Sequence, residues 1–161
     1  MRYIVLILIF WSCSSFAQIS TTRMNKIKLE MKTPDFLKLF GQQPIAFVED
    51  VEQKYTLNGL DYFVVIGRGF LSKNESDTYV RQIRTTSPKI KTLSNLGIGS
   101  SLEDLWKHYH KYQIYIEKLN DNQRSFRIED VENKSTLNFL LKNNKVIEIE
   151  VNSYNPEECF I

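Results

Sequence analysis

The chain has 161 residues, and its 21 Lys and Arg against 19 Asp and Glu give a formal net charge of +2. Nucleic-acid-binding domains carry a clear excess of cations, so this balance argues against a nucleic-acid partner. The cations are also scattered along the sequence. This argues against an anionic membrane as the main partner unless a lipid anchors the chain.

The first 17 residues have the composition of a secretory signal peptide. Arg2 supplies a positive charge, residues 4–11 form an apolar run, and residues 15–17 (SFA) have the small-residue spacing of a cleavage site. The apolar run is shorter than the roughly 20 residues that span a bilayer. We therefore expect export to the periplasm or the extracellular space, with cleavage after Ala17 leaving residues 18–161 as a single domain.

Cys13 supports an alternative fate for this segment. It follows Phe10-Trp11-Ser12, a loose match to the lipobox of bacterial lipoproteins, whose first two positions usually hold Leu and a small residue. A lipid on Cys13 would make the protein a membrane-anchored lipoprotein. If the segment is removed instead, Cys159 is the one remaining cysteine, and no disulfide can form within the chain.

The first helix is predicted in the stretch "MNKIKLEMKTPDFLKLFG", which begins at Met24. A short apolar strand precedes it. Thr33 is the expected N-cap, Pro34 suits the first helical position, and Gly41 is the expected left-handed residue at the end.

The next elements are strands. Residues 45–49 predict one strand, and Asn58-Gly59 is the signature of a two-residue β-hairpin turn. This turn predicts three cross-strand pairs: Leu57 with Leu60, Tyr55 with Tyr62, and Gln53 with Val64.

A second helix is predicted 69 positions after the first, in "LSNLGIGSSLEDLWKHYH" from Leu93. Ser100 with Glu103, or Ser101 with Asp104, has the spacing of a capping box. An apolar stripe at i, i+3, i+4 and i+7 predicts the side that packs on a sheet. The stripe consists of Leu102, Leu105, Trp106 and Tyr109.

The last elements are again strands, at residues 113–118 and 124–129, followed by a hairpin. In this hairpin a two-residue turn would set Phe139 opposite Glu148, which mixes core and solvent faces. We therefore predict a three-residue loop, Lys142 to Asn144, which sets Phe139 opposite Ile147.

Residues 79–87 also resemble residues 145–153, at an offset of 66. The sequence thus predicts two repeats, at about residues 24–92 and 93–155, each a helix followed by three or four antiparallel strands. We predict an α+β fold in which both copies share one sheet and both helices pack on one face of it. The alternative is a cystatin-like or NTF2-like single sheet curved around one helix.

A tandem of such units in an exported bacterial chain resembles the β-lactamase inhibitor protein fold. A single unit resembles the small lipoprotein of the outer-membrane barrel-assembly machine. The resemblance rests on "GIGSSLEDLWKHY", on "LNFLLKNNKVIEIEV" and on their counterparts in the first half. It implies a non-catalytic binding module, because both families act by protein contact across an exposed sheet.

No residue pattern indicates catalysis or a cofactor. His108 and His110 are two positions apart on a helix and point about 200° apart, so they cannot ligate one metal. Gly67-Arg68-Gly69 lacks the third glycine of a dinucleotide-binding loop. We therefore expect no enzyme activity, no cofactor and no metal, and keep a periplasmic hydrolase as an alternative function.

Strand alternation places apolar residues on the sheet face that the helices leave open. They are Phe63, Val65, Tyr115, Leu140 and Val146. Such a face is normally polar, so these residues predict a patch that contacts an unidentified protein partner. Isolated surface residues, or cover from the N-terminal segment, are the alternative. The expected function is that of an exported cell-envelope binding module, or else a lipid-anchored component of an envelope assembly.

Overall fold

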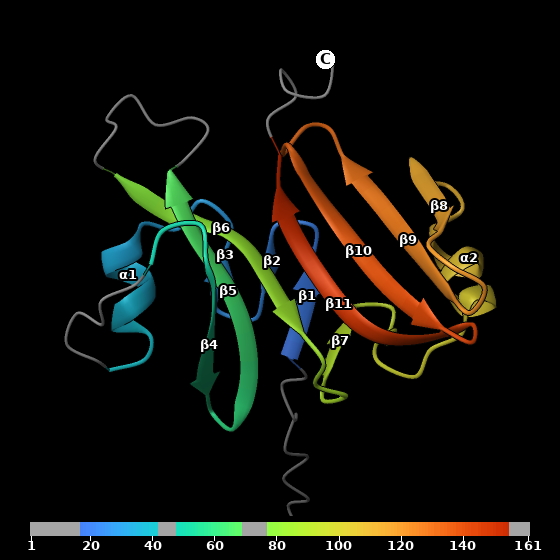
Figure 1. Ribbon diagram of the computed structural model, residues 1–161, viewed down its shortest axis with the longest axis horizontal. Coiled ribbons are helices and arrows are strands. Elements are labelled where there is room, and N and C mark those ends of the chain that lie inside the picture. Colours follow the sequence, from blue (N-terminus) through green and yellow to red (C-terminus); the bar gives the residue numbers. More distant parts are fainter. Residues whose placement is uncertain (1–16, 42–47, 69–76, 155–161) are drawn as a thin grey trace, which may run out of the picture.

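The computed structural model describes residues 17–41, 48–68 and 77–154, which form two β-sheets and two short helices (Figure 1). The helices are α1 (Thr33–Lys38) and α2 (Leu102–Tyr109). The strands of the larger sheet are β4 (Glu52–Leu57), β5 (Leu60–Arg68), β6 (Thr78–Thr85), β8 (Ile114–Lys118), β9 (Gln123–Asp130), β10 (Ser135–Lys142) and β11 (Lys145–Ser153). Those of the smaller sheet are β1 (Ala17–Ser20), β2 (Arg23–Met24), β3 (Ile27–Lys28) and β7 (Ile90–Thr92).

The larger sheet has the order β4-β5-β6-β11-β10-β9-β8, and every neighbouring pair in it is antiparallel. The smaller sheet has the order β3-β2-β1-β7. Its β1 and β7 pair in parallel although about 70 residues separate them in the sequence. The predicted antiparallel sheet is confirmed.

The predicted α+β class is wrong. The described chain is mostly β-structure, it contains a second sheet, and only one of its two helices exceeds six residues. Two helices that each lead into strands of one shared sheet do not describe it, and neither does a single sheet around one helix. The segments that form the smaller sheet are two to four residues long, and such short strands leave little periodicity in a sequence.

The two segments aligned at an offset of 66 are neighbours at the centre of the larger sheet, where β6 pairs with β11. Ile83 lies opposite Val151, and Thr85 lies opposite Ile149. Because residues 83 and 149 occupy equivalent places in this pairing, the two strands are related by local two-fold symmetry. The division of the whole chain into two repeats stays a prediction.

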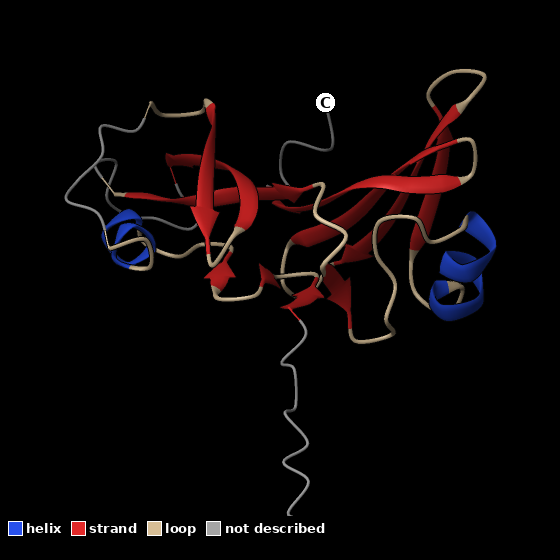
Figure 2. Cartoon of the chain, turned by 90° about the horizontal axis from the view of Figure 1, so that it is seen from below, coloured by secondary structure: helices blue, strands red, loops and turns tan. Residues whose placement is uncertain are grey.

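The core lies on one face of the larger sheet, on the side of the smaller sheet and the two helices (Figure 2). Phe36 of α1 packs edge-on against Tyr55 of β4, with ring centroids 4.9 Å apart. Tyr109 of α2 lies 6.0 Å from Phe139 and 6.5 Å from Phe126. The buried apolar side chains of the large sheet are Tyr55, Tyr62, Val64, Ile66, Val80, Ile83, Phe126, Ile128, Leu137, Phe139, Leu141, Val146, Ile149 and Val151.

The helix ends follow local sequence signals in part. Ser101 Oγ accepts a hydrogen bond from Asp104 N at 3.1 Å, and Asp104 Oδ2 accepts one from Ser101 N at 3.0 Å, so this capping box is confirmed. The predicted N-cap at Thr33 is wrong, because Lys32 is the N-cap and the Thr33 hydroxyl bonds instead to Thr78 at 2.8 Å. The left-handed Gly41 is confirmed, with φ of 63°.

The Asn58-Gly59 hairpin is confirmed in turn and register. Both residues have positive φ, of 53° and 72°. Leu57 pairs with Leu60, and the two further predicted pairs also form. A two-residue turn with positive φ at both positions matches the strand twist, which is why this signal is reliable.

The predicted three-residue loop of the last hairpin is wrong. Asn143 and Asn144 form a two-residue turn, with φ of 51° and 60°, and Lys142 pairs with Lys145. The register then shifts by one residue beyond Leu141, so that Phe139 faces Ile149 rather than Ile147. A β-bulge thus supplies the extra residue that keeps core residues on one face.

Two of the remaining predicted strands, at residues 113–118 and 124–129, correspond to β8 and β9. Of the predicted strand at residues 45–49, only residues 48 and 49 are described, and they form a turn region. Cys13 and Cys159 lie outside the described residues. Neither helix of the described chain has the length and hydropathy needed to cross a bilayer.

Candidate protein-interaction site

Four of the five residues predicted on the open sheet face do lie there. Phe63, Val65 and Leu140 are half-buried, and Tyr115 is 43% exposed. The outward position predicted for Val146 is wrong, because its side chain is 1% exposed and belongs to the core. The two-residue turn pairs Val146 with a buried leucine, and the bulge after it restores the alternation.

Charged side chains interrupt the apolar residues of this open face. The Arg84 guanidinium lies 4.3 Å from the centre of the Phe63 ring and covers it. Arg84 also forms ion pairs with Glu52 and, at 2.6 Å, with Glu148. At the far edge, Arg127 lies 5.1 Å from the Tyr115 ring. The open face is therefore a polar network over isolated apolar side chains.

Glu150 belongs to this network and is expected to destabilise the fold at neutral pH. Burial raises its pKa above the usual 4.5, the nearby Glu148 adds to the rise, and Gln82 Nε2 donates to it at 2.9 Å. A raised folded-state pKa means that the folded chain binds more protons, so stability falls as pH rises from about 4.5 through the folded pKa. Glu150→Gln should raise the urea midpoint at pH 7 and flatten this decline. An unchanged pH profile would contradict the assignment.

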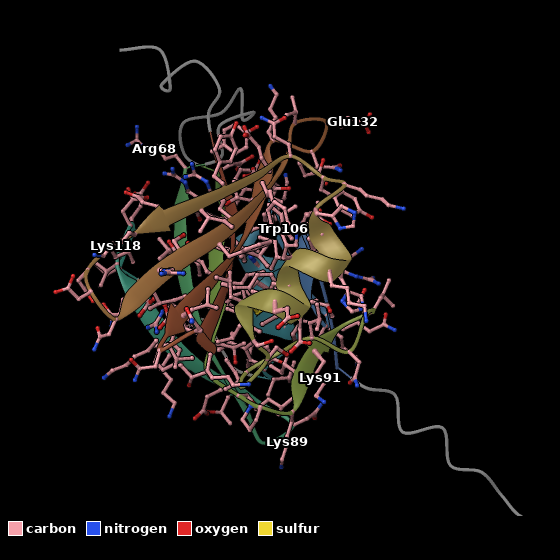
Figure 3. All side chains as sticks on the ribbon, turned by 90° about the vertical axis from the view of Figure 1, so that its right-hand side faces the viewer. Arg68, Lys89, Lys91, Trp106, Lys118 and Glu132 are labelled. Carbon is pink, nitrogen blue, oxygen red and sulfur yellow. The ribbon has the colours of Figure 1, made fainter. Side chains whose placement is uncertain are left out.

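A different surface lies where α2 meets the edge of the larger sheet. A hollow of about 400 Å³ opens there between α2, β8 and the turn that joins β10 to β11. Trp106 and Ile116 supply its apolar walls and remain 52% and 45% exposed. Its other lining residues are Ser101, Leu102, Glu103 and Asn144. Figure 3 shows Trp106 on α2 on this side of the molecule.

Trp106 and Ile116 are exposed because α2 does not extend over the last strand. Tyr109 of α2 packs on Phe126 and Phe139, in β9 and β10. Ile116 pairs with Phe126 and therefore faces the same side of the sheet, but it lies one strand further out. In the described part of the chain, no further strand covers the outer side of this core-facing isoleucine.

Among the described residues, the backbone of β8 forms hydrogen bonds on one side only, to β9. Gln113 O accepts a hydrogen bond from Glu129 N at 3.0 Å, and Leu119 N donates one to Gln123 O at 3.0 Å. In an antiparallel ladder these bonds recur at every second residue, so the odd-numbered residues of β8 are those that bond to β9.

The even-numbered residues of β8 therefore turn their backbone groups to the open edge. These are Ile114, Ile116 and Lys118, which offer three N–H and three C=O groups. No strand of the described chain pairs with this edge. Two of the three side chains are isoleucines, whereas proteins usually protect exposed edges with charge or proline.

The opposite end of the sheet is built differently. Alternation from the Leu57–Leu60 pair directs the backbone groups of Glu52, Lys54 and Thr56 away from β5. Lys54 pairs with Asp61 at 2.8 Å, and Glu52 pairs with an arginine. The open edge of β4 thus carries mainly charged side chains, whereas the open edge of β8 carries mainly apolar ones.

The sequence reasoning missed this site for a simple reason. Trp106 belongs to the helix stripe that is predicted to pack on a sheet, and Ile116 alternates with the outward-facing Tyr115, so both patterns predict burial. Only the strand order shows that β8 is terminal, and a single sequence does not reveal strand order. The sequence hints at a terminal strand only through a short helix followed by a strand that ends in the charged pair Glu117-Lys118.

The two histidines do not form a site with each other. His108 Nδ1 lies 2.9 Å from Asp104 O, and His110 Nδ1 lies 3.1 Å from Trp106 O, so each ring contacts the backbone of its own helix. Within residues 17–41, 48–68 and 77–154, no group of three or more His, Cys, Asp or Glu side chains is placed to hold a metal ion.

Searches against known proteins found little that is similar. No protein-family model and no curated protein matches the chain. One similar solved structure is the 2.13 Å crystal structure of a DUF4309 family protein (YjgB) from Bacillus subtilis subsp. subtilis str. 168. That chain is 12% identical to this one, with a TM-score of 0.49 and coverage of 86% of this chain and 88% of that chain. Similarity at this level carries no conclusion about fold or function.

Proposed function

We propose that this protein is an exported, non-catalytic binding module that takes up an extended segment of a partner protein as an added strand on β8. The observation that carries the proposal is the unpaired edge of β8 beside the hollow. The incoming strand would hydrogen-bond to Ile114, Ile116 and Lys118, and one of its apolar side chains would enter the space between Ile116 and Trp106.

In this mode of binding, the strand edge provides affinity and the hollow beside it provides specificity. Backbone groups at an exposed edge bond to any extended segment, and pockets beside the edge select particular side chains. Burying the exposed parts of Trp106 and Ile116 supplies apolar contact, at roughly 25 cal/mol per Å² removed from water. Tyr115, predicted from the sequence as a contact residue, lies on the opposite side of the same strand.

Export is supported by the N-terminal sequence, with its charged residue, apolar run and small residues before Gln18. A periplasmic or extracellular location follows if the segment is cleaved. A lipid on Cys13 would instead keep the same binding module at a membrane, as a component of an envelope assembly. Mass spectrometry of the mature N-terminus distinguishes the two forms.

Proline substitution tests strand addition directly. Ile116→Pro removes an N–H that points to the open edge, a place where proline is tolerated in a sheet. The variant should remain folded but lose the protein that the wild-type chain captures from envelope extract. Tyr115→Pro removes an N–H bonded to β9 and should lower the unfolding temperature.

Two further variants separate the edge from the open face. Trp106→Ser should lose capture, because it opens the hollow. Phe63→Ser, on the open face, should retain it. The proposal is wrong if Ile116→Pro and Trp106→Ser still capture the partner while Phe63→Ser does not, or if the wild-type chain captures no protein.

A further inference from the structure

The smaller sheet gathers cations that lie far apart in the sequence. Residues 17–29 and 85–102, which contain β1, β2, β3 and β7, include no Asp or Glu. They contain five cations: Arg23, Lys26, Lys28, Lys89 and Lys91. None of the five forms an ion pair in the described part of the chain. The segments that form the smaller sheet thus carry five cations and no acid, although the whole chain is nearly neutral; we call these five side chains the basic face.

The pairing register places three of these cations on the same face. Arg23 pairs with Lys28 across β2 and β3, and Gln18 pairs with Lys91 across β1 and β7. The residues that alternate with them, such as Met24 and Ile90, are fully buried. The cations therefore cover the solvent side of the smaller sheet, the side opposite the core.

The two other cations lie in adjoining turns. Lys26 is in the turn between β2 and β3, and Lys89 immediately precedes β7, and both are exposed. Figure 3 shows Lys89 and Lys91 close to each other in the lower part of the view, away from Lys118. The basic face is thus separate from the edge of β8.

An unburied leucine adjoins this basic face. Leu93 directly follows β7 and is 79% exposed, the largest exposure among the large apolar side chains of the described chain. Cations next to a projecting apolar side chain are typical of proteins that lie on anionic bilayers, where charge attracts and the apolar group inserts.

We propose that the basic face, defined by Arg23, Lys26, Lys28, Lys89 and Lys91, docks the protein on an anionic lipid surface, with Leu93 entering the headgroup region. The face contains no aromatic residue within residues 17–29 and 85–102, so it offers nothing on which single-stranded bases can stack. The exposed leucine has no use against a phosphate backbone. Lipid therefore fits the face better than nucleic acid.

Vesicle binding tests the proposal with the chain that starts at Gln18, so that the N-terminal segment cannot contribute. Sedimentation with phosphatidylglycerol vesicles at low salt should show binding, and phosphatidylcholine vesicles should show none. Each cation near a charged bilayer contributes about 1 kcal/mol, so the triple variant R23S/K28S/K91S should bind on the order of 100-fold more weakly. Leu93→Ser should weaken binding about tenfold, the order expected for one buried leucine.

The matched control changes the same number of charges elsewhere. K107S/K111S/K142S removes three exposed lysines outside the basic face and should bind vesicles like the wild type. Circular dichroism verifies that all variants fold. The proposal is overturned if the wild-type chain does not bind phosphatidylglycerol vesicles, or if both triple variants lose binding equally. It is also overturned if Leu93→Ser leaves vesicle binding unchanged. Binding to duplex DNA or RNA but not to vesicles would assign the face to nucleic acid instead.

Discussion

Replacing Phe139 by Ala should lower the free energy of unfolding by about 3–5 kcal/mol, the usual cost of removing a buried phenylalanine. Phe139 is fully buried at the middle of β10. Its ring lies 6.0 Å from that of Tyr109 and 6.3 Å from that of Phe126, so it joins α2 to the sheet. Urea denaturation followed by tryptophan fluorescence measures the loss.

Phe63→Ala is the matched control, because it removes the same group from the opposite face of the same sheet. Phe63 is half-buried and contacts the Arg84 guanidinium rather than the core. Its loss should cost about 1–2 kcal/mol, from partial burial and one cation–π contact. Equal losses for the two variants would show that the core is not confined to one face.

Replacing Arg84 by Met should be the most damaging change on the open face, at about 2–3 kcal/mol at pH 7. Hydrogen bonds that Arg84 donates to Glu52, and then to Glu148, raise the pKa of this arginine above its usual range. Its side chain is only 20% exposed, and the Glu148 side chain is 24% exposed. Removing one partner of a largely buried ion pair leaves carboxylates desolvated and facing one another, which costs more than losing an exposed pair.

The pH dependence of this loss identifies its cause. Without Arg84, the pKa of Glu150 should rise further, because the Arg84 charge lowers it, so the folded chain binds protons more readily than the unfolded chain. Stability of the variant should then recover as pH falls through the raised pKa of Glu150, because protonation of this carboxylate removes its repulsion by the neighbouring ones. Arg127→Met, which removes a guanidinium beside Tyr115, should show a small loss without this recovery. A pH-independent loss in Arg84→Met would contradict the charge argument.

Local signals in the sequence predicted local structure well. The Asn58-Gly59 turn specifies its own backbone geometry, so its register was predictable from two residues. The capping box at Ser101 is also a contact within four residues. The last hairpin shows the limit of such reasoning. Core alternation required one extra residue, but the pattern does not say whether a loop or a bulge provides it, and the bulge after Leu141 was missed.

Longer-range features were beyond the sequence because they depend on strand order and pairing. Ile116 has the pattern of a core residue, and its exposure follows only from the terminal position of β8. The basic face likewise depends on strand pairing that the sequence does not reveal. Lys28 and Lys91 are scattered cations in the sequence, and they share a face only because β1 joins segments about 70 residues apart. A net charge close to zero concealed this asymmetry.

Hydrogen exchange at single amides of β8 tests the proposed binding site most directly. In the free protein, the amides of Tyr115 and Glu117 should exchange slowly, because they bond to β9, and those of Ile114, Ile116 and Lys118 should exchange fast. Adding the captured partner should slow exchange at these three amides. The account is contradicted if the three are already protected in the free protein, or if the bound partner leaves their exchange unchanged.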